Sequence, residues 1–454
     1  MLTRLRIKNF KSLADTGDMD IRPLTFLVGP NSAGKSSVLQ VLLMLRQTVD
    51  ERDPNITLKI NDSWVKLGSY LDCIHRAAGE ELGSRELEID FTFLALDWDG
   101  LYAPTRNWSD SVPVDFNARF GYDGGIFLQQ ASYRFGANKF AIERVGPQQY
   151  VADDKIDVQP HKFYSCSVPS LSSIRTRKRQ VSDADIDEQI RNAEEDMRSE
   201  AEVVLLDMRI ELSSAQMQLF FSKVFYLGPL RRPPELSYDA SGEVPQDVGL
   251  SGERVMDVLI ASDKKKEDTP LTQVRHWLDI FDIASDVQLI AHTPTLYEFR
   301  LTDKRTGVAV NYPHVGFGAS QIVPIIVEGF YSPDHALLLV EQPEIHLHPR
   351  AQARLGDLLV DISQTSRTLI VETHSEHLLS QVQVRIAQGD VSREDVAIYY
   401  FEPTPAGTRV VPIEINELGQ FVNWPAGFFD EGLKLADAHL QAITTAQGRG
   451  DGRD

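Results

Sequence analysis

Apolar residues recur along the chain with two different spacings. Leu2–Ile7 alternates apolar and charged residues, and Leu24–Val28 is a continuous apolar run, so both segments are predicted strands. From Ser36 the apolar positions recur every three or four residues, which predicts a helix. The chain is therefore expected to begin with a strand, a loop and a helix.

The middle of the chain changes from strand-like to helix-like. Residues from about 85 to 168 alternate in type and are rich in Phe, Tyr and Gly, which predicts antiparallel strands. Ser182–Leu212 is predicted to be a helix. Its acidic part, Ile186–Glu202, is interpreted as a solvated face, with docking of another protein as a second hypothesis.

The last third alternates apolar strands with helical stretches, which indicates an α/β layer with parallel strands. The expected strands are Leu337–Val340, Thr368–Val371 and Val396–Phe401, and the expected helices are Gln352–Ser363 and Glu376–Ala387. Further helices are expected at Arg254–Ile260 and Leu271–Phe281, followed by strands over Val287–Val310.

Composition narrows the class of protein. The 454 residues favour two or three domains, and 46 basic against 66 acidic residues give a net charge of −20. The only cysteines are Cys73 and Cys166, no apolar run is long enough to cross a bilayer, and no signal peptide is visible. We expect a cytoplasmic protein without a membrane partner, and not a nucleic-acid binder coated in basic residues.

A phosphate-binding loop follows the second strand. Gly29–Ser36 matches G-x-x-x-x-G-K-[ST] at every fixed position, between a predicted strand and a predicted helix. Glycines let successive backbone N–H groups face phosphate oxygens, Lys35 supplies charge to the β- and γ-phosphates, and Ser36 offers its hydroxyl to Mg²⁺. The motif predicts binding of ATP with Mg²⁺. The candidate nucleotide-binding residues of the loop are Asn31, Ser32, Ala33, Gly34, Lys35, Ser36 and Ser37.

Three distant segments carry matching chemistry. Leu337–Glu341 is an apolar strand ending in a carboxylate, as a Mg²⁺ anchor requires. Thr368–Val371 is followed by Glu372-Thr-His374, whose histidine can reach a γ-phosphate from the side opposite the loop. Val315–Gln321 is a Gly-rich turn opening an apolar helix, which is a further anion site.

Together these motifs resemble the ABC-type ATPases of the SMC/RecF/OLD group, in particular stand-alone ATPases linked to antiphage defence. The segments that carry the resemblance are Ile7–Ser12, Val28–Ser37, Tyr226–Arg231, Gly316–Gln321, Val340–Pro349, Glu372–Ser375 and Trp424–Phe429. The resemblance implies an α/β ATPase head assembled from both ends of the chain, 1–80 and 221–454, with residues 81–220 inserted as a β-rich and helical region.

The resemblance also implies roles for individual residues. Glu341 takes the Walker B position and holds Mg²⁺ together with Ser36, while His374 is the switch histidine and Leu347 and His348 form the D-loop. Lys11 and Ser12 lie where this group approaches the nucleotide. Such ATPases form homodimers or higher assemblies in which a signature loop contacts the partner's ATP. That loop is expected here at Gly316, Gly318, Ser320 and Gln321.

The pattern departs from the group at the catalytic base. Gln342 stands at that position, and an amide cannot accept a proton at neutral pH, although it can orient water. Glu344 is the alternative base. We expect ATP hydrolysis that is slow or dependent on a partner. No convincing Q-loop glutamine is found; Leu67–Tyr70 occupies that region.

Rival interpretations are weaker. A zinc site at His346, His348, His374 and His377 has no cysteine nearby. Ser320 lacks the flanking glycines of a nucleophile elbow. The 80 residues after His374 are too few for the nuclease domain of larger relatives.

Two functions remain open. The first is an ATP-driven switch or sensor that controls a separate effector in antiviral defence. The second is a DNA-repair or DNA-organising ATPase that grips duplex DNA in its closed dimer, with Arg175–Arg179 or Arg231 and Arg232 as candidate contacts to DNA phosphates. A solvated helix start explains Arg175–Arg179 at least as well. Arg231, after a Gly-Pro turn, is also expected to line a site or the dimer interface.

Overall fold

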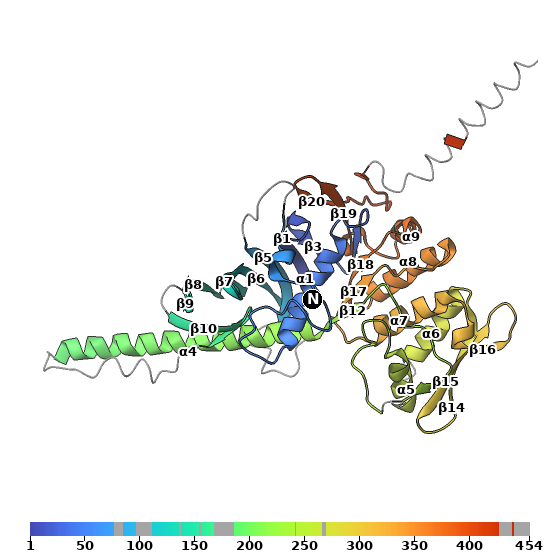
Figure 1. Ribbon diagram of the computed structural model, residues 1–454, viewed down its shortest axis with the longest axis horizontal. Helices are drawn as coiled ribbons and strands as arrows, with labels where there is room; N and C mark the ends of the chain where they lie inside the picture. Colours follow the sequence, from blue (N-terminus) through green and yellow to red (C-terminus); the bar gives the residue numbers. More distant parts are fainter. Residues whose placement is uncertain are drawn as a thin grey trace, which may run out of the picture.

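The computed structural model describes residues 1–76, 85–96, 111–135, 138–153, 156–167, 186–240, 242–265, 269–425 and 438–439. Figure 1 shows an elongated molecule in which a long helix, α4 (Ile186–Ser222), extends away from a body of two large sheets and a smaller lobe. The basic string Arg175–Arg179 and the end of the Trp424–Phe429 segment lie outside the described residues.

The central sheet draws strands from both ends of the chain. Its order is β12 (Val224–Leu227), β17 (Leu337–Glu341), β18 (Thr368–Glu372), β4 (Leu24–Val28), β19 (Val396–Thr404) and β20 (Gly407–Pro412). All neighbouring pairs are parallel except β19 with β20. The predicted parallel α/β layer is therefore confirmed, and its N-terminal strand lies between two C-terminal ones.

Both faces of this sheet are buried, as continuous apolar strands require. Leu337 and Leu339 enter one core, which includes the apolar face of α1 (Lys35–Asp50). Leu338 and Val340 point the other way, into a second core. That second core contains residues of α7 (Phe317–Tyr331), α8 (Pro349–Ser363) and α9 (Glu376–Ala387).

The second large sheet is antiparallel, and it confirms the strands predicted between residues 85 and 168. Its order is β11 (Ser165–Ser167), β10 (Ile156–Lys162), β9 (Gln149–Ala152), β8 (Asn138–Gly146), β7 (Ile126–Phe135), β6 (Ser111–Tyr122), β5 (Leu87–Leu96), β1 (Leu2–Phe10) and β2 (Leu13–Asp15), with β3 (Met19–Asp20) on β1. Because β1 pairs with β5, this sheet takes strands from both sides of residue 80.

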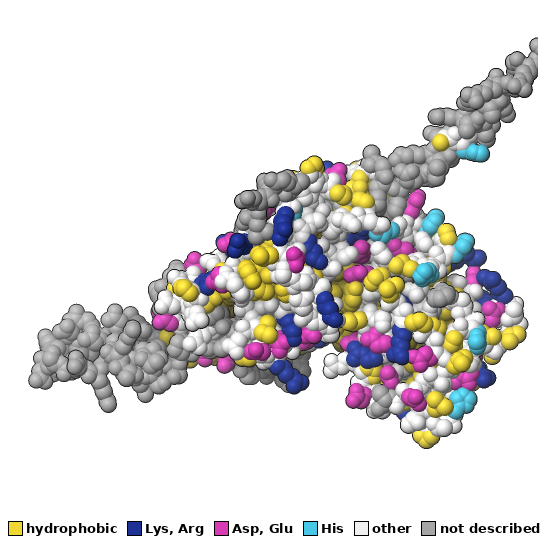
Figure 2. All heavy atoms as spheres, in the orientation of Figure 1, with side chains coloured by type: hydrophobic (Ala, Val, Ile, Leu, Met, Phe, Trp, Pro, Cys, Tyr) yellow, Lys and Arg dark blue, Asp and Glu magenta, His cyan; other side chains and the backbone are white. Residues whose placement is uncertain are grey.

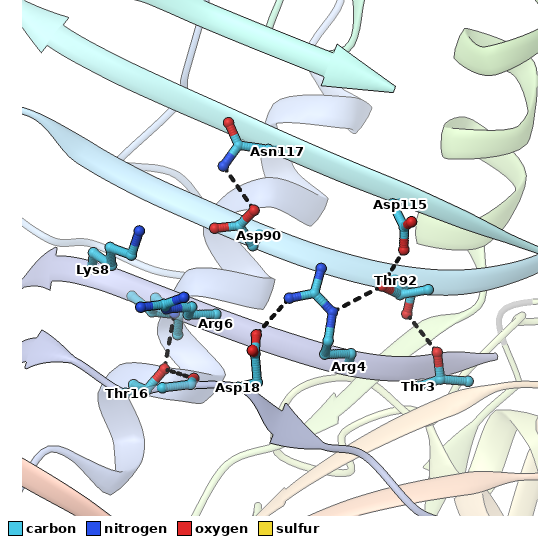
Figure 3. Close-up of polar contacts among 12 residues, drawn as sticks. Thr3, Arg4, Arg6, Lys8, Thr16, Asp18, Asp90, Thr92, Asp115 and Asn117 are labelled. Carbon is cyan, nitrogen blue, oxygen red and sulfur yellow. Dashed lines mark hydrogen bonds and ion pairs between the residues drawn. The ribbon is translucent and has the colours of Figure 1, made fainter. Parts of the chain in front are cut away.

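One face of the antiparallel sheet is tied together by polar side chains (Figure 3). The Nε of Arg4 on β1 donates to the hydroxyl of Thr92 on β5 (3.1 Å), which donates to Asp115 on β6 (2.7 Å). Asn117 on β6 donates in the same way to Asp90 on β5 (2.7 Å). These bonds cross the strands and support the register that the apolar face sets from the other side.

The opposite face holds α4 through aromatic rings. Phe91 and Phe93 of β5 pack against Phe220 and Phe221 of α4, with ring centroids 4.9–6.2 Å apart. The predicted helix is confirmed, and it continues to Ser222, ten residues beyond the expected end. Its last turns are stabilised by burial of these rings rather than by the polar pattern on which the prediction rested.

A smaller lobe precedes α7. It contains α5 (Val255–Lys265), α6 (Thr269–Ile280) and a sheet of β13 (Tyr238–Asp239), β15 (Leu296–Asp303), β14 (Ala284–Ala291) and β16 (Ala309–Asn311), followed by the short helix η3 (Tyr312–His314). The two helices and the strands expected in this region are confirmed. Elsewhere lie the short helices α2 (Tyr70–Cys73) and η4 (Arg393–Asp395). Within the described ranges, no helix is both long and apolar enough to cross a membrane.

The attachment of α4 gives a stability prediction. Phe221 is 0% exposed, so Phe221→Ala leaves a cavity and is expected to lower the free energy of unfolding by about 3–5 kcal/mol. Leu219, two residues away and 45% exposed, is the control, and Leu219→Ala should cost under about 1 kcal/mol. Denaturant unfolding followed by circular dichroism measures both; equal losses would contradict this packing.

Candidate nucleotide-binding site

The loop Gly29–Ser36 lies between the end of β4 and the start of α1. Gly29 (φ 141°) and Gly34 (φ 92°) adopt backbone conformations that favour glycine. A Cβ on Gly29 would lie 2.6 Å from the carbonyl oxygen of Phe401, and one on Gly34 would lie 2.3 Å from the Ser12 hydroxyl. Both glycines are therefore required by conformation and by space.

The C-terminal hairpin β19–β20 holds this loop from behind. The Thr408 hydroxyl donates to the carbonyl oxygen of Ala33 (2.8 Å), and the Thr408 N–H donates to that of Ser12 (2.7 Å). Lys11 is anchored on the other side, where its Nζ donates to Gln40 of α1 (2.6 Å). Ser12 and Lys11 thus lie beside the loop, as expected, and the Ser12 hydroxyl is buried without a hydrogen-bond partner.

Lys35 is the buried cation of the site, with 3% of its surface exposed. Its Nζ donates to the carbonyl oxygens of Gly29 (3.1 Å) and Pro30 (2.8 Å) and lies 3.9 Å from Glu372 Oε1. Burial lowers the pKa of Lys35, while the charges of Glu372 and Glu344 oppose that shift. The ammonium group is thus held over the loop and next to carboxylates from the strand ends.

Two of these carboxylates are neighbours because their strands are in register. Glu341 ends β17 and Glu372 ends β18, and the two residues are paired across the parallel ladder. Burial, together with the negative charge of Glu372, raises the pKa of Glu341 to about 7. Burial also raises the pKa of Glu372, which is opposed by a hydrogen bond from the Ser36 side chain and by Lys35.

Glu344 connects the turn after β17 to the segment after β18. Its Oε1 accepts a hydrogen bond from the His374 N–H (2.6 Å), and burial raises its pKa. Burial and the charge of Lys35 lower the pKa of His374 to about 4, so this histidine is neutral at pH 7. Glu344 Oε2, Glu372 Oε2 and His374 Nε2 are buried without hydrogen-bond partners, which fits a site shaped for a ligand that supplies them.

Gln342 occupies a constrained position between these acids. Its φ is 42°, in the left-handed region, and its N–H donates to the carbonyl oxygen of Glu372 (2.8 Å). The Gln342 carbonyl accepts a hydrogen bond from the N–H of Ile345, which closes a turn. The backbone therefore fixes where Gln342 leaves the strand end, beside Glu341 and Glu372.

The predicted signature loop lies at the N-terminus of α7, on the other face of the central sheet from α1. Gly316 is exposed and caps the helix without a side-chain hydrogen bond, and Gly318 packs against Leu347. Ser320 and Gln321 are buried within the chain, on the inner side of the first two turns of α7. Of the four predicted residues, Gly316 and Gly318 are the ones accessible to a second chain.

Glu372 lies outside the set of site residues that the sequence pattern predicts. It is nevertheless the carboxylate that contacts Ser36 and Lys35, whereas Glu341 accepts a hydrogen bond from Tyr226 of β12. The available signal was the same one that identified Glu341, namely an apolar strand ending in an acid. Which acid faces the loop depends on strand order, which sequence alone did not give.

The residues fit Mg²⁺ bound with a nucleotide better than a metal held by protein alone. In the described part of the chain, no group of three or more His, Cys, Asp or Glu side chains could hold a metal ion. Magnesium needs fewer protein ligands, since it keeps waters and binds phosphate oxygens. Ser36, Glu341 and Glu372 are the side chains available for that purpose.

Fold and site together define an ABC-type P-loop ATPase of the SMC/OLD-like group. Residues 116–380, more than half of the chain, match the family model "AAA domain, putative AbiEii toxin, Type IV TA system", and the chain belongs to this family. Residues 1–97 match an AAA ATPase domain, and residues 391–438 match a "Protein of unknown function (DUF3696)".

Similar individual proteins include an OLD nuclease from Thermus scotoductus, 23% identical over 388 residues. The alignment covers 83% of this chain and 59% of that protein, so the chain spans less than two thirds of its length. Among solved structures, the SMC head domain from Thermotoga maritima matches with 12% identity and a TM-score of 0.41, over 91% of this chain and 99% of that one. An Smc head domain with an extended coiled coil from Pyrococcus furiosus, bound to the C-terminal domain of ScpA, matches with 12% identity and a TM-score of 0.44, over 98% and 99% of the two chains.

The raised pKa of Glu341 gives a pH-dependent stability prediction. Because the folded protein holds this proton up to about pH 7 and the unfolded chain loses it near pH 4.5, folding stability is lost as the pH rises through this window. Glu341→Gln should therefore raise the free energy of unfolding of the nucleotide-free protein by about 1–3 kcal/mol at pH 8, and by much less at pH 5. The melting temperature at each pH is the measurement. Exposed Glu417→Gln is the control, and an equal gain at both pH values would contradict this assignment.

Proposed function

We propose that this chain is an ATP-operated switch: ATP with Mg²⁺ binds at the loop Gly29–Ser36 and closes two copies of the chain into a dimer that controls a separate effector. The observation that carries the proposal is the cluster of Lys35, Glu341, Glu372 and His374 at the start of α1 and just after or at the ends of β17 and β18. Lys35 and Glu372 are buried, and Glu341 and His374 are half-buried. Such a cluster of ionisable groups destabilises the folded chain when no ligand is bound. Its ammonium group complements phosphate oxygens, and its carboxylates complement a bound Mg²⁺.

Each group in the cluster has a task when the nucleotide binds. Lys35 would replace its hydrogen bonds to the carbonyl oxygens of Gly29 and Pro30 by hydrogen bonds to phosphate oxygens. The Ser36 hydroxyl would leave Glu372 and bind the metal. The neutral His374 ring has one donor and one acceptor nitrogen, so it would contact the phosphates through a hydrogen bond and not through a positive charge. The chemistry that Mg²⁺ supplies is the neutralisation of phosphate charge.

Dimer formation is supported by the N-terminus of α7. The first N–H groups of a helix have no intrahelical acceptor and attract anions, and Gly316 leaves them without a side-chain cap. Gly316 and Gly318 carry no side chains that would keep a phosphate away from this end. A second copy that presents its bound ATP here would satisfy these groups.

Slow hydrolysis is supported by Gln342. Its amide occupies the position between Glu341 and the turn to Glu344, where a carboxylate would act as a general base. Glu344 is the alternative base, but one of its oxygens accepts a hydrogen bond from the His374 N–H. A long-lived ATP-bound state suits a switch better than a fast enzyme.

Control of an effector in antiviral defence is supported by the matched family, whose description names an AbiEii toxin and a type IV TA system. The DNA-gripping alternative has less support. On the face shown in Figure 2, Lys and Arg side chains are scattered among acidic ones rather than gathered into one patch. Weak retention of duplex DNA in the presence of ATP is therefore expected in a filter-binding assay.

Dimerisation is tested by mass. Light scattering should show that ATP doubles the mass of the wild-type protein but not that of Lys35→Ala, which lacks the phosphate-binding charge.

Gly316→Asp is designed to separate dimerisation from ATP binding. Aspartate is a good helix N-cap, and a Cβ at Gly316 meets no atom within 4 Å, so the fold and ATP binding should persist. Its charge should repel the partner's phosphates and abolish dimerisation, whereas Gly316→Ala, which adds neither a charge nor a capping group, should dimerise. A mass independent of ATP in the wild type would refute the model.

The catalytic position is tested by Gln342→Glu. If the amide limits hydrolysis, a carboxylate there should raise steady-state ATP turnover at least about tenfold, while Gln342→Ala should not exceed the wild type. Phosphate release at saturating ATP is the measurement. Fast turnover by the isolated wild-type protein, unaffected by Gln342→Ala, would show that this position does not limit the reaction.

A further inference from the structure

Arg231 is buried where its neighbours are not. It follows β12 in the turn Gly228–Arg232, which is clamped by hydrogen bonds from the Gly228 N–H to the carbonyl oxygen of Leu250 (2.9 Å) and from the Arg232 N–H to that of Ser251 (2.8 Å). Leu230 is 76% exposed and Arg232 faces solvent, whereas Arg231 is 8% exposed. The clamped backbone therefore directs the Arg231 guanidinium inward.

The buried guanidinium is incompletely paired. Its Nε and Nη1 atoms are buried without a hydrogen-bond partner. A guanidinium has five N–H donors in a fixed planar arrangement and cannot lose its charge at neutral pH, so leaving donors buried and unpaired is unfavourable. A residue retained in this state is typical of a site that is completed by an anionic ligand.

Its surroundings belong to the nucleotide site. β12 is parallel to β17, with Leu227 paired to Val340, so the turn after β12 begins at the level of Glu341. The Tyr226 hydroxyl donates to the Glu341 carboxylate, and burial lowers the pKa of Arg231 to about 10 although the negative charge of Glu341 opposes that shift. Arg231 therefore lies on the side of Glu341 opposite Glu372.

We propose that Arg231 binds the terminal phosphate of the nucleotide and thereby makes the site distinguish ATP from ADP. This inference rests on the proposed function of the same site. Lys35 and the loop N–H groups bind phosphates that ATP and ADP share, whereas a guanidinium beyond Glu341 is placed to contact only the additional phosphate. Without that phosphate, the buried donors of Arg231 stay unpaired, which is unfavourable. Closure of the dimer is therefore expected with ATP and not with ADP.

The test compares Arg231→Met, which keeps an unbranched apolar stem and removes the guanidinium group, with Arg232→Met. Arg232 is the adjacent exposed arginine, paired with Glu235 at 2.5 Å, and serves as the matched control. Calorimetric titration with Mg²⁺ and either ADP or a slowly hydrolysed ATP analogue gives the two dissociation constants. Arg231→Met should weaken the ATP analogue at least about tenfold and change ADP binding less than about twofold. Arg231→Lys should recover part of the loss.

Thermal unfolding without nucleotide separates this role from a structural one. Removing an unpaired buried charge should raise the melting temperature of Arg231→Met above that of the wild type, while Arg232→Met should leave it unchanged. A lower melting temperature with an unchanged ratio of the two dissociation constants would overturn the proposal. If the wild type binds neither nucleotide, or binds both regardless of Lys35→Ala, the proposed nucleotide site itself is refuted.

Discussion

The carboxyl groups of Glu341, Glu344 and Glu372 and the ammonium group of Lys35 lie close together where β17 and β18 end and α1 begins, and all but the half-buried Glu341 are buried. Glu341 and Glu372 are forced into proximity by parallel register, and Lys35 lies 3.9 Å from Glu372. Burial raises the pKa of Glu341, and the neighbouring negative charge of Glu372 raises it further. Such a cluster is stable only while the surrounding backbone holds it, so much of the fold can be understood as support for this edge of the sheet.

That support comes from both ends of the chain. The N-terminal loop is held by Thr408 of β20 and by the backbone of β19 at Phe401, several hundred residues away in sequence. The Glu344 carboxylate holds the segment after β18 by accepting a hydrogen bond from the His374 N–H, and the turn after β12 directs Arg231 inward. In the proposed switch, a nucleotide at this edge would contact the loop and the segments that follow β12, β17 and β18 at once. Binding of the third phosphate would then affect several segments of the head together.

The sequence predicted the parts of this arrangement that depend on local pattern. The loop Gly29–Ser36, the apolar strands and the ends of α9 follow from spacing and residue type, and the structure has them where they were expected. The sequence could not give the strand order, and for that reason Glu372 rather than Glu341 is found next to Ser36 and Lys35. Likewise, the burial of Ser320, Gln321 and Arg231 depends on packing between distant segments, which alternation along the chain does not encode.

The protonation state of the carboxylate cluster provides the most direct test of this account. With a pKa of about 7, Glu341 is roughly half protonated at pH 7 before ligand binding, and it must ionise to face Mg²⁺ with the nucleotide. Calorimetric titration of preformed Mg–ATP at pH 7, in buffers of different protonation enthalpy, should reveal net release of protons on binding, at most about one per chain from Glu341. The release should disappear by pH 9, where Glu341 is already ionised. No release at pH 7, or release that is unchanged at pH 9, would contradict a self-repelling acid cluster that awaits its ligand.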